Sequence, residues 1–374
     1  LDLVRQGNEH VIGARFADAD FFVREDLKHR LEDFRPRLGA LTFQKKLGSM
    51  LEKNARIERL TEALIPLLGL EADEAVFARR AAALAKADLA TKMVVEMTSL
   101  QGIMGREYAL RSGENAAVAE AIGEQYQPVP KTKAGLAVAL ADRLDSLPGL
   151  FAAGLAPSGT KDPFALRRAA IGLVQALIEH DLDFDLRLAV AKAAGLQPLE
   201  ANADVQSQVL DFIAGRLGYL LKESYRYDVV DAVLAAQSDN PAGAKRAVEQ
   251  LTAWVGRADW STILPGYARC VRITRDQKEK FVVKPETFVE DAEKGLYVAL
   301  LKVEGPRTTD GGLRWTVDEF LNSVVEMIPA INTFFDQVLV MAEEKELREN
   351  RLGLLQRISA LADGIADLSK LEGF

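Results

Sequence analysis

Hydrophobic residues recur at spacings of three and four along almost the whole chain. Leu47 and Leu51 form one such stripe, and Ile57, Leu60 and Leu64 form another. On a helix with about 3.6 residues per turn, these spacings place apolar side chains on one face. The sequence therefore predicts a mostly α-helical protein.

Strand signals are brief by comparison. The β-branched runs at 281–283 (FVV) and 297–300 (YVAL) have no neighbouring run to pair with, so we predict loops or a minor hairpin there. Two long helical stretches are predicted near the end of the chain. The first covers 317–341 with a kink near Pro329, because proline removes a helical hydrogen bond, and the second covers 345–371.

Helix-breaking residues divide the chain. The segment 155–160 (LAPSGT) interrupts the helical pattern, and a new helix start follows it. Asp162 can cap the free amides of that helix, and Pro163 suits its first turn. We predict three regions, at residues 1–160, 161–225 and 226–374.

Length and composition limit the class of protein. With 374 residues, 48% of them hydrophobic, the chain is long enough for two or three domains. It begins at Leu1 within a helical pattern, so we expect a piece of a longer polypeptide. We expect no membrane segment, because no run of about 18 apolar residues is present. The single cysteine, Cys270, excludes an intrachain disulfide and favours a reducing cytoplasm.

Charge is distributed unevenly. The net charge is −8, and residues 1–170 carry 24 basic and 23 acidic residues, whereas the remainder carries 23 and 32. Basic clusters occur at residues 44–46, 79–80, 131–133 and 167–168, and at Lys345, Arg348, Arg351 and Arg357. Such clusters usually serve solubility and helix pairing, but they are also what contact with phosphate requires. The pattern predicts a discrete nucleic-acid footprint if nucleic acid is bound at all.

Catalytic and metal-binding signals are weak. His10, His29 and His180 lie far apart in the sequence, so a zinc site with nitrogen ligands is hard to assemble. Cys270 has no histidine nearby and is more typical of a buried core residue than of a nucleophile. We therefore predict no catalytic residue and no metal site.

A series of ordered motifs resembles the β subunit of bacterial heterotetrameric glycyl-tRNA synthetase. The motifs extend over nearly the whole chain, in the same order as in that family. They are residues 7–11 (GNEHV), 16–22 (FADADFF), 43–48 (FQKKLG), 84–89 (LAKADL), 100–105 (LQGIMG), 139–145 (ALADRLD), 161–169 (KDPFALRRA), 334–341 (FFDQVLVM) and 346–352 (ELRENRL).

The resemblance implies the C-terminal portion of that subunit. It implies an HD-like helical domain with a preceding connecting helix, a helical linker region, and a C-terminal helical anticodon-binding domain of the DALR type. The implied partners are tRNA-Gly and the synthetase α subunit, in the cytoplasm, with no DNA and no membrane. In this family ATP and Mg are used by the α subunit, so the chain alone is expected to hold no cofactor and to be noncatalytic.

The resemblance also implies that the first domain is similar to HD-type phosphohydrolases. These enzymes present an adjacent His-Asp pair on a helix, and residues 81–89 (AAALAKADL) have the apolar spacing of that helix. Lys86 and Ala87 stand at the two ligand positions, and only Asp142 remains of the metal-binding set. One carboxylate does not hold a catalytic divalent ion. We hypothesise that Lys86 and Asp142 form a salt bridge in its place.

The same resemblance suggests residues for RNA contact. For the anticodon side, the candidates are Arg348, Asn350, Arg351 and Arg357. For the acceptor side, they are Lys45, Lys46, Arg79, Arg80, Lys86, Arg167 and Arg168.

Two alternatives remain at this point. A metal-dependent phosphohydrolase would use Asp88, Asp142 and Asp145 to bind Mn, Mg or Zn. A purely structural arm would dock the α subunit and would bind no RNA by itself.

Overall fold

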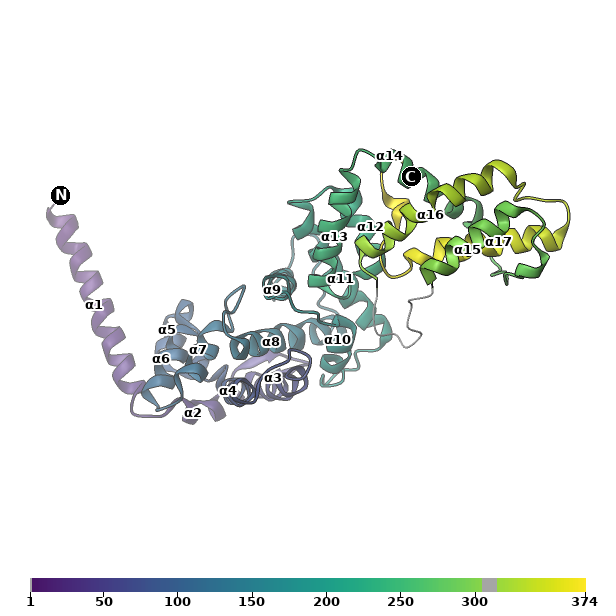
Figure 1. Cartoon of the computed structure of the whole chain (residues 1–374). Coiled ribbons are helices and arrows are strands. Elements are labelled where there is room, and N and C mark those ends of the chain that lie inside the picture. Colours follow the sequence, from purple (N-terminus) through teal and green to yellow (C-terminus); the bar gives the residue numbers. More distant parts are fainter. Residues whose placement is uncertain (1, 305–314) are drawn as a thin grey trace. The chain divides into compact units, whose positions relative to one another are not determined.

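The chain is helical, as its hydrophobic pattern predicts. The computed structural model describes residues 2–304 and 315–374 (Figure 1). Within these ranges the chain forms seventeen α-helices and two short strands. No helix in the described part of the chain is long and apolar enough to cross a membrane.

Contacts divide the chain into two compact units, Leu1–Arg216 and Leu217–Phe374. The division falls inside helix α11 (Ala203–Lys222). It does not test the three sequence regions, whose boundaries stay a prediction.

The first unit contains the following elements before α11. They are α1 (Asp2–Asp26), α2 (Leu31–Phe34), η1 (Arg35–Ala40), β1 (Thr42–Gln44), β2 (Gly48–Ser49), α3 (Met50–Leu64), α4 (Ala72–Leu84), η2 (Ala87–Ala90), α5 (Lys92–Glu96), η3 (Thr98–Leu100), α6 (Ile103–Arg111), α7 (Ala116–Glu124), α8 (Lys133–Ala152), α9 (Leu166–Glu179) and α10 (Leu186–Ala194).

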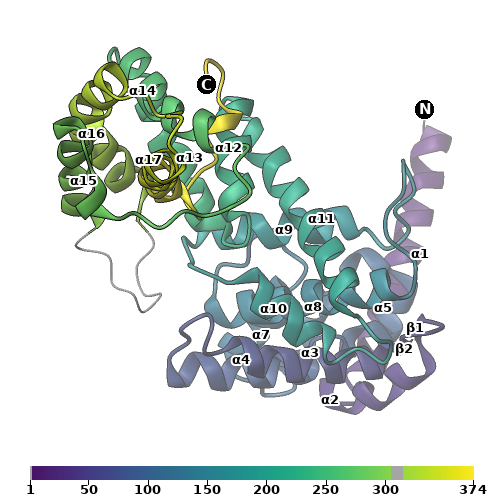
Figure 2. The ribbon, with the colours of Figure 1, turned by 90° about the vertical axis from the view of Figure 1, so that its right-hand side faces the viewer.

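Helix α8 is the central helix of the first unit. Helices α3, α4, α7, α9 and α10 all pack against it, and Figure 2 shows several of them around it. Its residues are buried on every side, including Leu140 and Leu144, as expected for a helix that is apolar all round. Thr132 caps its N-terminus, where the Thr132 hydroxyl accepts a hydrogen bond from Gly135 N at 3.0 Å. The two carboxylates that α8 carries, Asp142 and Asp145, therefore lie inside the bundle.

A short hairpin leads into α3. Strands β1 and β2 pair in antiparallel fashion, and Lys45 and Lys46 lie in the turn between them. The Ser49 side chain accepts a hydrogen bond from Glu52 N at 3.3 Å, and the Glu52 carboxylate accepts one from Ser49 N at 2.7 Å. This reciprocal capping box fixes the start of α3.

The stretch 81–89 is not one continuous helix, which corrects the sequence prediction. Helix α4 ends at Leu84, and the 3₁₀ turn η2 begins after Lys86. Asp88 explains the break, because its Oδ2 accepts a hydrogen bond from Gly102 N at 2.6 Å and its carbonyl accepts one from Thr91 Oγ1 at 2.7 Å. These contacts hold the backbone in a tighter turn than an α-helix allows.

The second unit is also a helical bundle. After α11, its elements are α12 (Tyr227–Gln237), α13 (Pro241–Val255), α14 (Trp260–Thr274), η4 (Pro285–Thr287), α15 (Asp291–Glu304), α16 (Val317–Gln337), α17 (Lys345–Ser359), η5 (Ala360–Ala362) and η6 (Leu368–Lys370). Helix α14 packs against α16 and α17, and α15 packs against α16.

Three local predictions in this unit are wrong or only partly right. Residues 297–300 lie inside α15 and not in a loop or hairpin, because apolar side chains such as Leu296 and Leu300 pack that helix into the core. The predicted helix 345–371 ends at Ser359, before Gly364 adopts a φ of +74° that no α-helix permits. Helix α16 contains Pro329 and ends at Gln337, so it is shorter than predicted.

Candidate functional site

Lys86 lies between the end of α4 and the turn η2. Its side chain is buried, and its Nζ lies 2.6 Å from Asp142 Oδ2 on α8. The salt bridge hypothesised from the sequence is therefore confirmed. The ammonium group of Lys86 thus occupies one side of the Asp142 carboxylate.

Two further cations complete a buried ion cluster, which we define as Lys53, Arg56, Lys86, Asp142 and Asp145. Lys53 Nζ lies 2.9 Å from Asp142 Oδ1 and 2.9 Å from Asp145 Oδ2. Arg56 Nε lies 2.6 Å from Asp145 Oδ1. The cations of α3 are three residues apart, and so are the carboxylates of α8. This matched spacing places the two pairs opposite each other on packed helices.

The cluster shifts the pKa values of its members in opposite directions. Burial alone raises the pKa of Asp142, but the ammonium groups of Lys53 and Lys86 outweigh burial and hold that pKa well below its usual range. Burial lowers the pKa of Lys53, yet Asp142 and Asp145 raise it more, so the net shift is upward. For Lys86 burial dominates, and repulsion from Lys53 adds to it, so its pKa is lowered.

The donor set does not fit a divalent metal. Asp142 and Asp145 face ammonium and guanidinium groups, and a metal cation placed there would be repelled by Lys53 and Lys86. Asp88 uses Oδ2 to accept a backbone amide, and burial raises its pKa. Across residues 2–304 and 315–374, no three His, Cys, Asp or Glu side chains are grouped as metal ligands. The contacts therefore do not support the phosphohydrolase alternative.

The acceptor-side candidates fall into two groups. Lys45, Lys46 and Arg168 are exposed, and their side chains make no hydrogen bond or ion pair with the described residues. The others are engaged within the protein. Arg79 pairs with Glu62, Arg80 with Glu32 and Glu114, Lys86 with Asp142, and Arg167 donates to the carbonyl of Gly159. RNA contact by any of them stays a prediction.

Two of the anticodon-side candidates are buried in the second unit. Asn350 accepts a hydrogen bond from Lys284 N at 2.7 Å and donates to Thr287 Oγ1 at 2.8 Å. Arg351 Nε lies 2.7 Å from Glu293 Oε1 on α15. Both residues are less than 5% exposed, and their side chains anchor α17 to its neighbours. Their RNA contact remains untested, but neither presents a surface to RNA.

The other two candidates are partly exposed. Arg348 Nη1 donates to the carbonyl of Ala342 at 2.8 Å, and Arg357 pairs with Glu304. Arg357 also lies over the ring of Tyr297, 5.5 Å from its centre. These contacts leave part of each guanidinium accessible.

A cavity beside Arg357 contains basic residues that sequence reasoning missed. We call it the basic cavity, and its volume is about 530 Å³. Its lining includes Arg275, Lys278, Lys280 and Phe281, together with Arg357. The signal was present in the sequence as residues 275–284 (RDQKEKFVVK), where four basic residues surround one aromatic residue. A cation-rich wall with an aromatic side chain is typical of single-stranded RNA sites.

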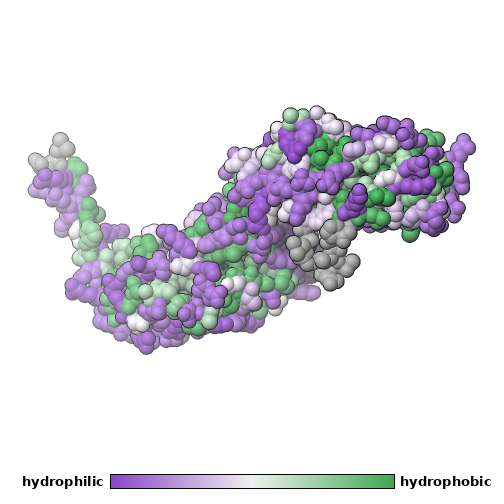
Figure 3. Space-filling view, viewed as in Figure 1, coloured by the Kyte–Doolittle hydropathy of each residue, from purple (hydrophilic) through white to green (hydrophobic). Residues whose placement is uncertain are grey.

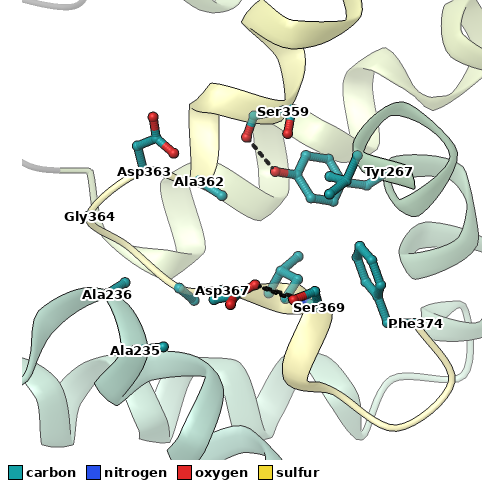
Figure 4. A pocket seen from close by; sticks show the side chains of 13 residues that line it. Ala235, Ala236, Tyr267, Ser359, Ala362, Asp363, Gly364, Asp367, Ser369 and Phe374 are labelled. Atoms are coloured by element: carbon teal, nitrogen blue, oxygen red, sulfur yellow. Dashed lines mark hydrogen bonds between the residues drawn. The ribbon is translucent and has the colours of Figure 1, made fainter. Parts of the chain in front are cut away.

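A second cavity in this unit has the opposite character. It measures about 400 Å³ and lies between α12, α14 and the C-terminal turns (Figure 4). Tyr267 OH donates to the carbonyl of Ser359 at 2.7 Å, and Asp367 accepts a hydrogen bond from Ser369 Oγ at 2.6 Å. Its lining contains the carboxylates Asp363 and Asp367 and no basic residue, so it does not suit a phosphate. Asp363 also lines the basic cavity.

Comparison with known proteins gives two matches to protein families. Residues 1–235 match the family described as glycyl-tRNA synthetase beta subunit, and residues 263–368 match the DALR anticodon binding domain. The basic cavity lies almost entirely within the second match.

Individual relatives are similar over nearly the whole chain. The glycine-tRNA ligase beta subunit of Moorella thermoacetica is 41% identical over 99% of this chain and 55% of its own length. The beta subunit of Myxococcus xanthus is 43% identical over 98% of this chain and 54% of its own length. The chloroplastic/mitochondrial glycine-tRNA ligase 2 of Arabidopsis thaliana is 38% identical over 100% of this chain and 35% of its own length. The chain thus spans about half the length of the bacterial relatives.

Proposed function

Because this chain belongs to the glycyl-tRNA synthetase β-subunit family, we propose that it is a tRNA-binding part of that subunit. In this proposal it binds tRNA-Gly and supports aminoacylation by a separate α subunit, which uses ATP and Mg. The chain itself performs no chemical step. Its buried ion cluster is then a structural remnant at a former metal position.

The observation that carries this proposal is the basic cavity. Arg275, Lys278 and Lys280 are exposed and have no ion-pair partner among the described residues. Uncompensated cations attract a phosphate backbone, whereas Phe281 offers a surface on which a base can stack. Because the cavity falls in the region that matches an anticodon-binding domain, we assign it to the anticodon arm.

The first unit would contact a different part of the tRNA. Lys45 and Lys46 project from the hairpin turn before α3, and Arg168 lies on α9. These three cations are exposed and unpaired within the described residues, so they suit phosphate contacts that position the RNA without reading its sequence. We propose the acceptor side as their target.

A titration tests the anticodon assignment. The chain is mixed with tRNA-Gly, and with the same tRNA carrying a substituted anticodon, over a series of salt concentrations. We expect binding that weakens with salt, because phosphate contacts release counterions, and weaker binding of the substituted tRNA, because base contacts are lost. Equal binding of both RNAs at every salt concentration would refute the anticodon assignment.

A subunit-docking role has separate support. Residues 4–18 of α1 are exposed, including the apolar side chains Val4, Val11 and Phe16, and Figure 3 shows apolar patches along this helix. A partner that covers α1 would bury them. In this second candidate function the α subunit is that partner. Replacing Val11 and Phe16 with serine should then weaken α-subunit binding in a pull-down assay, whereas tRNA affinity stays unchanged.

A further inference from the structure

A third cavity lies in the first unit, beside the Lys86–Asp142 ion pair. Its volume is about 400 Å³, and it is lined by residues of α8 and α9 and of the segment that follows α7. This volume is within the usual range for small-molecule sites. Its lining includes Tyr126, Asp142, Arg143, Phe164, Arg168 and Gln175.

The charge of the cavity wall favours an anion. Asp142 is the carboxylate of the wall, and Lys53 and Lys86 neutralise it from behind. Arg143 donates through Nη1 to the carbonyl of Gly172 at 2.8 Å, and Arg168 has no partner among the described residues. The wall therefore presents excess positive charge, with one guanidinium free to form charge-assisted hydrogen bonds.

Buried polar atoms at this cavity lack partners. Gln125, which also lines it, is 2% exposed and donates through Nε2 to the carbonyl of Ile122 at 2.9 Å. Its Oε1 accepts no hydrogen bond within the described residues, and the hydroxyl of Tyr126 is also without a partner there. Both atoms have almost no accessible surface and so lie behind the cavity wall. The polar side chains that a ligand can reach are the more exposed ones, Arg168 and Gln175.

The backbone at the cavity mouth is strained. Ala165 has φ 54° and ψ 37°, a left-handed conformation that alanine rarely adopts. Asp162 holds it there, because its two carboxylate oxygens accept hydrogen bonds from Leu166 N at 2.8 Å and Arg167 N at 2.9 Å. This capping role of Asp162 was predicted, although α9 begins at Leu166 and not at Pro163. Phe164 and Arg168, on either side of Ala165 in the sequence, both line this cavity.

We propose that this cavity binds one nucleotide. Arg168 contacts the phosphate, and the ring of Phe164 provides a stacking surface for the base. The amide of Gln175, which lines the cavity, supplies one donor group and one acceptor, which the edge of a base requires. No metal and no bond cleavage are involved. The nucleotide is either free in solution or the end of an RNA strand, since both present the same chemistry.

Binding of nucleoside monophosphates to the chain tests this proposal. AMP, GMP, CMP, UMP and inorganic phosphate are titrated separately by calorimetry. We expect saturable binding of at least one nucleotide, more tightly than inorganic phosphate. In Arg168→Gln this affinity should fall about tenfold or more, because a hydrogen bond to a charged group is lost.

A matched control is Arg59→Gln. Arg59 is also exposed and unpaired among the described residues of the first unit, but it lies on α3 outside this cavity. It should retain the affinity of the unaltered chain. Equal affinity in the two variants, or no saturable binding of any nucleotide at millimolar concentration, would overturn the proposal.

Competition then identifies the source of the nucleotide. If tRNA-Gly displaces the nucleotide, and Arg168→Gln abolishes that displacement, the cavity takes the end of the RNA. If tRNA binds without displacing it, the cavity takes a free nucleotide. The site does not depend on the anticodon assignment, because mononucleotide binding is measured without tRNA. A chain that binds no tRNA but binds AMP through Arg168 would refute the proposed function alone.

Discussion

The buried ion cluster of the first unit and the basic cavity of the second contain similar numbers of cations but different surroundings. Lys53, Arg56 and Lys86 lie between two carboxylates at distances of 2.6–2.9 Å. Lys278 and Lys280 face solvent with no carboxylate partner among the described residues. The difference shows that a basic residue in the sequence is not necessarily free to contact a nucleic acid, because carboxylates brought close by the fold can neutralise it.

Substitutions in the two regions should therefore change different quantities. In the buried ion cluster they should change the free energy of unfolding, and in the basic cavity the affinity for RNA. Removing a member of the buried ion cluster leaves an uncompensated charge in a low-dielectric interior, so the free energy of unfolding changes. Removing Arg275, Lys278 or Lys280 from the basic cavity leaves no partner unpaired among the described residues, so RNA affinity should change and stability should not.

The largest effect is expected for Asp145→Ala. Its carboxylate is 1% exposed and pairs with both Lys53 and Arg56, so its removal leaves two buried cations with too little negative charge. We expect the free energy of unfolding of the first unit to fall by about 3–5 kcal/mol. Urea unfolding followed by far-UV circular dichroism measures this loss.

Tryptophan fluorescence provides an internal reference for that experiment. All three tryptophans, Trp254, Trp260 and Trp315, belong to the second unit, so their transition reports on that unit. The exposed Asp20→Ala on α1 serves as the matched control and should leave the circular dichroism transition in place. If the free energy of unfolding fell by less than about 1 kcal/mol in Asp145→Ala, this would contradict the view that Asp145 neutralises the buried charges of Lys53 and Arg56.

A smaller effect is expected for Lys86→Met. Burial lowers the pKa of Lys86, which means that its charged form is not fully compensated in the folded protein. Asp142 retains Lys53 at 2.9 Å in the variant. The loss at neutral pH should therefore be roughly 1–2 kcal/mol, less than for a carboxylate that is shared by two cations.

The pH dependence of this loss has a definite sign. The pKa of Asp142 in the folded chain lies below its unfolded value of about 3.9, so its stabilisation is present above that pH and is lost as the pH falls. Without Lys86 the folded pKa rises toward the unfolded value. The difference in unfolding free energy between the unaltered chain and Lys86→Met should thus shrink as the pH falls from about 5 toward about 2. A difference that grows on acidification would contradict the assigned ion pair.

Sequence alone predicted the fold class and one ion pair of this site. The 3–4 spacing of apolar residues is a local property, so the helices followed from it, and Lys86 and Asp142 followed from the positions of a known motif. Lys53 and Arg56 were missed because their partners lie about ninety residues away on another helix. The repeated three-residue spacing was visible, but nothing in the sequence shows that α3 and α8 pack together.

The sequence did not predict which charged residues are buried. Arg351 was expected at the surface because its spacing from Lys345, Arg348 and Arg357 places it on roughly the same face of the predicted last helix. In the structure Glu293 of α15 neutralises it, in a stretch whose helical character was itself partly mispredicted. Conversely, Lys278 and Lys280 were overlooked because they follow the end of a helix and form no regular pattern. Their exposure depends on tertiary packing alone.

The smallest effect is expected for Lys278→Gln in the basic cavity. Because Lys278 is exposed and has no partner within the described residues, its substitution should not shift either unfolding transition. If it contacts one phosphate of the tRNA, affinity should fall about twofold to fivefold at moderate salt, and the slope of log affinity against log salt should decrease by about one. The exposed Lys302→Gln on α15, outside the basic cavity, is the matched control and should leave that slope unchanged. An identical salt slope in both variants would exclude a phosphate contact at Lys278, and the basic cavity would then differ from the buried ion cluster only in exposure and not in function.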